Sequence, residues 1–174
     1  MRVLVVVDMQ NDFVTGSLGT KEAQAIVPKI KSKIEEYKQS HDLILFTQDT
    51  HDSRYMMTQE GRNLPVTHCI KGTDGWQIVD GILCDTIPYE KNTFGSLQLA
   101  QELKEENGML HIEQIELIGV CTGICVLSNA ALLKAALPEI PIVVDASCCA
   151  CVTPESHETA LDAMKLLQIK VVNE

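Results

Sequence analysis

Short apolar runs alternate with helical patterns along most of the chain. The apolar runs are the expected strands, and they cover residues 3–7, 43–47, 86–89, 115–120, 142–144 and 169–172. Such continuous runs are typical of strands that helices cover on both faces. Strands that alternate with helices predict a three-layer α/β/α fold, with a doubly wound, mostly parallel sheet of six strands.

Four helical patterns lie between these strands. They are centred on residues 26–37, 96–108, 129–137 and 153–167. The first contains Pro28, which we place near the helix start, where proline is tolerated. Residues 50–85 have only weak periodicity, and a long irregular segment in a compact domain is usually functional, although it can contain a short helix.

The composition fits one globular domain, residues 1–174, because 45% hydrophobic and 22% charged residues are ordinary for a soluble protein. The formal net charge is -10, and no basic cluster is interleaved with aromatics. This argues against a nucleic-acid or membrane partner. The first apolar run reaches Asp8 too early for a signal peptide or a membrane span, so we expect a cytoplasmic protein.

The seven cysteines are odd in number and show no spaced disulfide framework, which fits a reducing compartment. Cys148, Cys149 and Cys151 follow the fifth strand too closely spaced for a zinc ribbon, so we expect them to have packing roles. Three residues separate Cys121 from Cys125, whereas two separate the cysteines of thioredoxin-like sites, which argues against a redox pair.

Polar residues follow each of the first four strands. In chain order they are Asp8, then Asp49 and His51, then Lys91, then Cys125. Each alone has an ordinary reading as a turn, loop, surface or core residue. Because ligands bind outside the carboxyl ends of parallel strands, their shared position predicts a site.

Cys125 falls in the first turn of the helix that follows the fourth strand. Free N–H groups and the positive end of the helix dipole predict a lowered pKa for a thiol there. A carboxylate at Asp8 could take the thiol proton, while the ammonium of Lys91 stabilises both charges. The pattern therefore suggests a triad of base, cation and nucleophile.

Asp49 and His51 project to the same side of an extended segment and could bind one metal ion, with His68 as a third ligand. Three protein ligands leave positions open for water, as in catalytic sites, and that water could be a nucleophile. These donors favour zinc, with iron or manganese as alternatives.

Five stretches resemble the isochorismatase-like cysteine hydrolases, and among these the nicotinamidases. They are Val-Val-Asp-Met-Gln-Asn-Asp-Phe at 6–13, Thr-Gln-Asp-Thr-His at 47–51, Thr-His-Cys-Ile-Lys-Gly-Thr-Asp-Gly at 67–75, Glu-Lys-Asn-Thr-Phe-Gly-Ser at 90–96 and Gly-Val-Cys-Thr-Gly-Ile-Cys-Val at 119–126. The resemblance spans nearly the whole chain. Its specificity comes from the order and combination of these motifs.

The resemblance implies roles for the residues already noted. The triad would be Asp8, Lys91 and Cys125, and the metal ligands would be Asp49, His51 and His68. A cis peptide bond is implied between Val120 and Cys121, with the backbone N–H groups of Cys121 and Cys125 as an oxyanion hole. The family resemblance also suggests self-association.

Two departures from the nicotinamidase pattern concern the substrate pocket. Asp49 is followed by Thr-His-Asp where Trp-His-Pro is common, and Pro65 stands where a tryptophan commonly packs on the pyridine ring. Phe13 is the expected aromatic wall for the substrate, and Trp76 is a second candidate. Aromatic residues make up only 4% of the chain, so few other stacking partners exist.

These observations predict a metal-assisted cysteine amidohydrolase that acts on a small amide, with nicotinamide converted to nicotinate and ammonia. The alternatives are a hydrolase of another small amide or carbamoyl compound, an isochorismatase-type hydrolase, and a non-catalytic or redox relative. Cleavage of a vinyl ether by an isochorismatase needs no thiol, so Cys125 argues against that reading. The complete set of triad and metal residues argues against the loss of activity.

Overall fold

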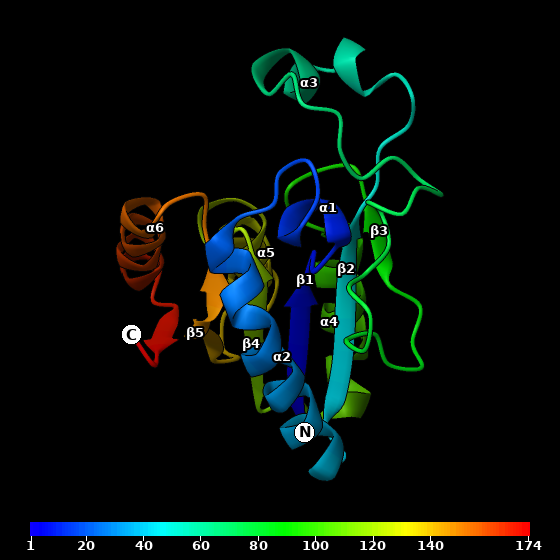
Figure 1. The fold of residues 1–174 in the computed structure, drawn as a ribbon. Coiled ribbons are helices and arrows are strands. Elements are labelled where there is room, and N and C mark those ends of the chain that lie inside the picture. The colour runs from blue at the N-terminus through cyan, green and yellow to red at the C-terminus, as the bar shows by residue number, and fades with distance from the viewer.

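The computed structural model describes residues 1–174 and contains one six-stranded parallel sheet between two layers of helices (Figure 1). The strands are β1 (Arg2–Val7), β2 (Leu43–Asp49), β3 (Tyr89–Lys91), β4 (Gln114–Val120), β5 (Ile142–Ala150) and β6 (Lys170–Val172). Their order is β3-β2-β1-β4-β5-β6, so the direction of winding reverses between β1 and β4. The predicted fold class is confirmed.

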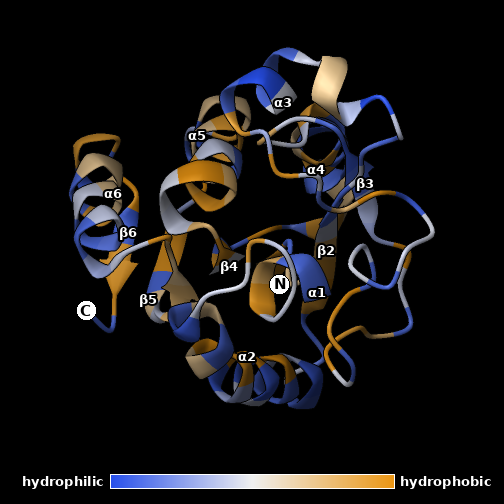
Figure 2. Ribbon diagram, turned by 45° about the horizontal axis from the view of Figure 1, so that its top comes forward, coloured by the Kyte–Doolittle hydropathy of each residue, from blue (hydrophilic) through white to orange (hydrophobic).

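The helices cover both faces of this sheet. They are α1 (Asn11–Val14), α2 (Lys21–Gln39), α3 (Gln59–Asn63), α4 (Leu97–Leu110), α5 (Leu127–Ala136) and α6 (Pro154–Leu166), with a 3₁₀ turn η1 (Tyr55–Met57) and a π-helical turn η2 (Thr122–Val126). The apolar side of α2 packs on one face (Figure 2), and α4, α5 and α6 pack on the other. No helix combines the length and the hydropathy that crossing a membrane requires.

The central strand β1 shows why its sequence is apolar without alternation. Val3, Val5 and Val7 face the core shared with α4, α5 and α6. Leu4 and Val6 face the core shared with α2. All five side chains are buried, because a central parallel strand has helices on both sides.

Strand β5 continues six residues past its predicted end. Asp145 resembles a strand terminus in sequence, but its buried carboxylate lies 3.0 Å from Lys33 Nζ on α2 and accepts a hydrogen bond from Ser147. A bulge in the pairing with β4 accommodates these residues. Cys148 and Cys149 consequently lie inside the strand, and Cys151 follows it directly.

Two other boundaries differ from the prediction. Strand β3 begins at Tyr89 rather than residue 86, since Ile87 is almost fully exposed and Pro88 has no N–H to donate. Helix α2 begins after its cap Thr20, which places Pro28 in the interior of the helix rather than near its start. Pro28 is exposed, so water can reach the backbone carbonyl that proline leaves unpaired.

Candidate active site

Three residues from different strand ends meet at the carboxyl edge of the sheet, beside the point where its winding reverses. The Nζ atom of Lys91 lies 2.6 Å from Asp8 Oδ2 and 3.6 Å from Cys125 Sγ. All three side chains are buried. The structure therefore brings together the three residues that the sequence nominated as a triad.

The carboxylate of Asp8 is held by the neighbouring strand β2. The hydroxyl of Thr47 donates to Asp8 Oδ1 at 2.6 Å, and Asp8 takes a positive φ of 49°. The other oxygen, Oδ2, contacts Lys91 but accepts no well-directed hydrogen bond. Burial raises the pKa of Asp8 even though Lys91 opposes this effect. One carboxylate oxygen is therefore available to receive a proton.

Gly119 allows β4 to approach the end of β1. Its φ is +119°, and a β-carbon at this position would collide with the carbonyl oxygen of Val7. Val7 directly precedes Asp8, so this close approach fixes the distance between the end of β1 and the turn that carries Cys125.

Cys125 lies in the π turn η2, between β4 and α5. The side chain of Asn129 donates to the Cys125 carbonyl at 2.8 Å and accepts from the Ser96 N–H at 2.9 Å, which ties the turn to the start of α4. The expected lowered pKa is wrong. Burial and the Asp8 carboxylate raise the pKa of Cys125 well above its ordinary value, and Lys91 only partly opposes them. The resting side chain is a neutral thiol.

The backbone before Cys125 has the expected conformation. The Val120–Cys121 peptide bond is cis. The N–H of Cys121 makes no backbone hydrogen bond, which leaves it free to donate to a ligand.

The three predicted metal ligands also converge, and their donor atoms all lie within 4.8 Å of one another. Asp49 Oδ2 is 3.0 Å from His51 Nε2 and 3.5 Å from His68 Nε2. Although burial raises it, the pKa of Asp49 is held well below its ordinary value by its close contacts with the two histidines and by the charge of Lys91. The carboxylate is therefore ionised, as a metal ligand must be.

Two further observations test whether a metal ion fits here. His68 Nδ1 lies 2.8 Å from the Val66 carbonyl, which keeps the proton on Nδ1 and leaves Nε2 free to coordinate. The buried Nε2 of His51 has no well-directed hydrogen-bond partner. A buried nitrogen without a partner costs free energy unless it coordinates a ligand. The residues present therefore fit a divalent cation.

Glu60 is a candidate ligand that the sequence did not reveal. Its Oε1 lies 3.7 Å from Nε2 of both His51 and His68. The residue belongs to the short helix α3, inside the segment without clear periodicity. It does not follow a predicted strand, and most candidate residues were chosen by that criterion. The ring of Tyr55 packs 4.7 Å and 4.8 Å from the two histidine rings and supports them.

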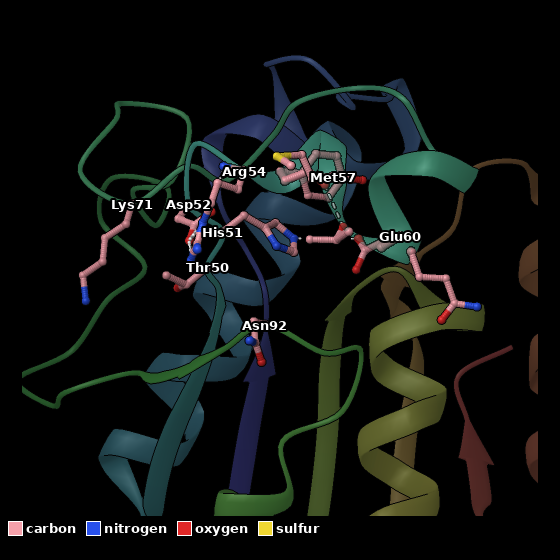
Figure 3. Close-up of a pocket in the computed structure, with 11 residues that line it drawn as sticks. Thr50, His51, Asp52, Arg54, Met57, Glu60, Lys71 and Asn92 are labelled. Carbon is pink, nitrogen blue, oxygen red and sulfur yellow. Dashed lines mark hydrogen bonds and ion pairs between the residues drawn. The ribbon is translucent and has the colours of Figure 1, made fainter.

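Two cavities flank this cluster. An apolar cavity of about 250 Å³ contains Cys125 and is lined mainly by Phe13, Leu18, Leu64, Phe94, Ile124 and Val152. A hydrophilic cleft of about 710 Å³, shown in Figure 3, is lined by residues that include Thr50, Arg54, Lys71 and Asn92. Asp49 and His68 face the apolar cavity, His51 faces the cleft, and Glu60 borders both.

Only one of the two aromatic residues that we expected in the substrate pocket lines the apolar cavity. Phe13 lines the apolar cavity, with its ring 5.5 Å from that of His68. The expectation for Trp76 is wrong, because it does not line the cavity and its indole N–H donates to the Thr50 hydroxyl at 2.8 Å. Phe94 was missed as a wall residue, although its place three residues after Lys91 could have suggested it.

The isochorismatase domain model matches residues 2–173, so the chain belongs to the isochorismatase family. The nicotinamidase of Saccharomyces cerevisiae is 32% identical over 110 residues, a match that spans 48% of this chain and only half of that protein. An Arabidopsis thaliana protein described as a probable inactive nicotinamidase is 26% identical over 96% of this chain and 89% of its own length. The crystal structure of Pyrococcus horikoshii pyrazinamidase in complex with zinc is 29% identical and covers 99% of both chains with a TM-score of 0.83.

Proposed function

We propose that this protein is a metal-dependent cysteine amidohydrolase that converts nicotinamide and water to nicotinate and ammonia. The contact of the Lys91 ammonium with both Asp8 and Cys125, at the wall of a small apolar cavity, is the observation that carries this proposal. A proton acceptor, a cation and a nucleophile in mutual contact are the groups that attack on a bound amide requires.

In the first half of the reaction, Asp8 removes the proton of Cys125 as its sulfur attacks the carboxamide carbon. The negative charge passes to the substrate oxygen, which accepts hydrogen bonds from the backbone N–H groups of Cys121 and Cys125. Asp8 then gives its proton to the departing nitrogen, and ammonia leaves a thioester on Cys125. Lys91 enters the reaction as a cation, because Asp8, Cys125 and Asp49 together outweigh burial and keep its pKa raised.

In the second half, Asp8 acts as the base for water. It takes a proton as water attacks the thioester carbon, and the same N–H groups hold the oxyanion. Collapse of this intermediate releases the carboxylic acid product, and Cys125 recovers its proton from Asp8. The carboxylate thus transfers a proton at each stage without a second base.

Asp49, His51 and His68, with Glu60 beside them, would hold a divalent cation, and this donor set favours zinc over iron or manganese. Such an ion supplies Lewis-acid chemistry, which lowers the pKa of water or polarises an electron-rich atom of the substrate. The four side chains would hold this ion at the boundary between the apolar cavity and the hydrophilic cleft.

The shape and polarity of the cavity support a flat, uncharged substrate. Phe13 and Phe94 supply ring faces, and Leu64 supplies an apolar side chain next to Pro65, where a tryptophan would otherwise stand. A pyridine ring packed among them would direct its carboxamide toward Cys125.

Ammonia release from nicotinamide by the zinc-loaded, full-length protein tests this proposal, with Cys125→Ala as the control. We expect ammonia from the wild type, none above background from the variant, and a nicotinoyl thioester on Cys125 after acid quenching. A silent wild type, or a variant as active as the wild type, would contradict the proposal. Chelation that leaves the rate unchanged would exclude the metal from the reaction.

A further inference from the structure

A second pair of cysteines lies in the wall of the active-site cavity. Val120 at the end of β4 pairs with Ala150 at the end of β5, and a cysteine directly follows each strand, Cys121 after β4 and Cys151 after β5. Neighbouring strands are about 4.8 Å apart, inside the range of about 4.4–6.8 Å that a disulfide spans between Cα atoms. Both residues line the same cavity as Cys125.

The surroundings of Cys151 favour the ionised form of its side chain. Its sulfur lies 3.6 Å from the position that a β-carbon would take on Gly123, so it packs against the backbone of η2. Although burial raises it, the pKa of Cys151 is lowered to about 5 by hydrogen bonds from the Cys121 thiol, the Ser156 side chain and two nearby backbone N–H groups. The contact with Cys151 and burial raise the pKa of Cys121. A thiolate therefore lies beside a thiol, which is the arrangement that forms disulfides readily.

The other cysteines do not share this position. Cys148 and Cys149 point into the two opposite hydrophobic cores of the sheet. Cys69 and Cys84 lie outside the cavity. Cys125 is engaged with Asp8 and Lys91, and its thiol is neutral at rest.

We propose that Cys121 and Cys151 form an oxidation site in the cavity wall, which a peroxide or a small-molecule disulfide converts to a Cys121–Cys151 disulfide. With hydrogen peroxide, the Cys151 thiolate attacks one oxygen, the O–O bond breaks and hydroxide leaves, which gives a sulfenic acid. The sulfur of Cys121 then attacks the Cys151 sulfur, and water leaves as the S–S bond forms. The two cysteines lose two electrons in total, and the peroxide gains them.

This site is independent of the proposed function, because no step uses Cys125 or an amide. The zinc-loaded, full-length protein is treated with one equivalent of hydrogen peroxide, and disulfide-linked peptides are mapped by mass spectrometry. We expect the loss of two hydrogen atoms and a peptide that links Cys121 to Cys151. Cys121→Ser and Cys151→Ser should each abolish the link, whereas Cys84→Ser, a change outside the cavity, should retain it.

A link that survives Cys151→Ser, a link from Cys121 to Cys125, or thiols that stay reduced would each overturn the proposal. If the serine variants do not fold, the wild type alone supplies the test. Brief iodoacetamide labelling at pH 6 should then mark Cys151 before Cys84, and prior oxidation should abolish the Cys151 label. Equal labelling of the two residues would contradict an ionised Cys151.

Discussion

The ends of β4 and β5 lie side by side, and a helical segment follows each strand. Cys125 lies inside the segment after β4 and Cys151 lies directly after β5, yet the two thiols have opposite acidities. Cys125 is surrounded by low-dielectric protein and by the carboxylate of Asp8, which raise its pKa. Cys151 faces hydrogen-bond donors, which lower its pKa to about 5. A position at a helix start therefore does not decide the ionisation of a thiol; the nearest charges and donors do.

The difference suits two kinds of chemistry. A neutral thiol beside a base is activated only when an electrophile is bound, because the proton moves during the attack. A resting thiolate reacts with any small electrophile that enters the cavity. Changes that move one of these pKa values without the other should separate amide hydrolysis from thiol reactivity.

Removal of the base should give the largest effect. In Asp8→Asn we expect the rate of ammonia release to fall by about 10³-fold, since proton transfer by a positioned group contributes about 10²–10⁴. The loss of the negative charge should also lower the pKa of Cys125, because the largest electrostatic contribution that opposes Lys91 is then removed. Alkylation of Cys125 at pH 7 should consequently become faster while catalysis fails. Iodoacetamide rates for Cys125 and Cys151, measured by peptide mapping, check this, and slower labelling of Cys125 would refute the assigned role of Asp8.

Removal of the cation should give the next largest effect, on stability. Lys91→Met leaves the buried carboxylates of Asp8 and Asp49 without their ammonium partner. We expect the free energy of unfolding of the metal-free protein to fall by about 3 kcal/mol, as is usual when one partner of a buried ion pair is lost. Cys151→Ala, which removes no partner of an ion pair, should cost about 1 kcal/mol. Urea unfolding of both variants gives the comparison, and equal losses would mean that Lys91 has no special structural role.

The sequence predicted the central part of the fold because burial on both faces leaves a direct signal. Strand β1 consists almost entirely of valine and leucine, and its ends agree closely with the prediction. Strand β5 was cut short because Asp145 looks like a strand end. Its partners Lys33 and Ser147 neutralise the cost of burial, but the contact with Lys33 exists only after α2 has packed on the sheet.

The site was predictable to the extent that strand ends define it. Asp8 and Lys91 lie at or just after a strand end, and Cys125 lies in the turn that follows β4. Because ligands bind near the switch point of such a sheet, the sequence predicted that these residues share one site. Glu60 was missed because α3 has no apolar period. The sign of the Cys125 pKa shift was missed because it depends on Asp8, which is remote in sequence and close only in space.

The pH dependence of alkylation compares thiols in a single experiment. In a Cys125→Ser protein, the lowered pKa of Cys151 keeps its thiolate populated above about pH 5, so its alkylation rate should be nearly constant from pH 6 to 8 and fall in acid. Burial raises the pKa of Cys84, so its rate should still increase across the same range. Quenched time courses with site-resolved mass spectrometry provide both profiles, and parallel profiles would mean that the cavity does not distinguish Cys151.

The smallest expected effect concerns the hydrogen bond between the two cavity thiols. In the Cys125→Ser background, Cys121→Ala removes the thiol donor to Cys151 and leaves the Ser156 side chain and two backbone N–H groups to stabilise the thiolate. The midpoint of the Cys151 alkylation profile should therefore move to higher pH. Cys121→Ser keeps an O–H donor, so the midpoint of its Cys151 profile should lie between that of the Cys125→Ser parent and that of the Cys121→Ala variant. A midpoint that does not move in either variant would assign the acidity of Cys151 to Ser156 and the backbone of Gly123 and Val152 alone. Cys121 would then contribute only its sulfur to the pair.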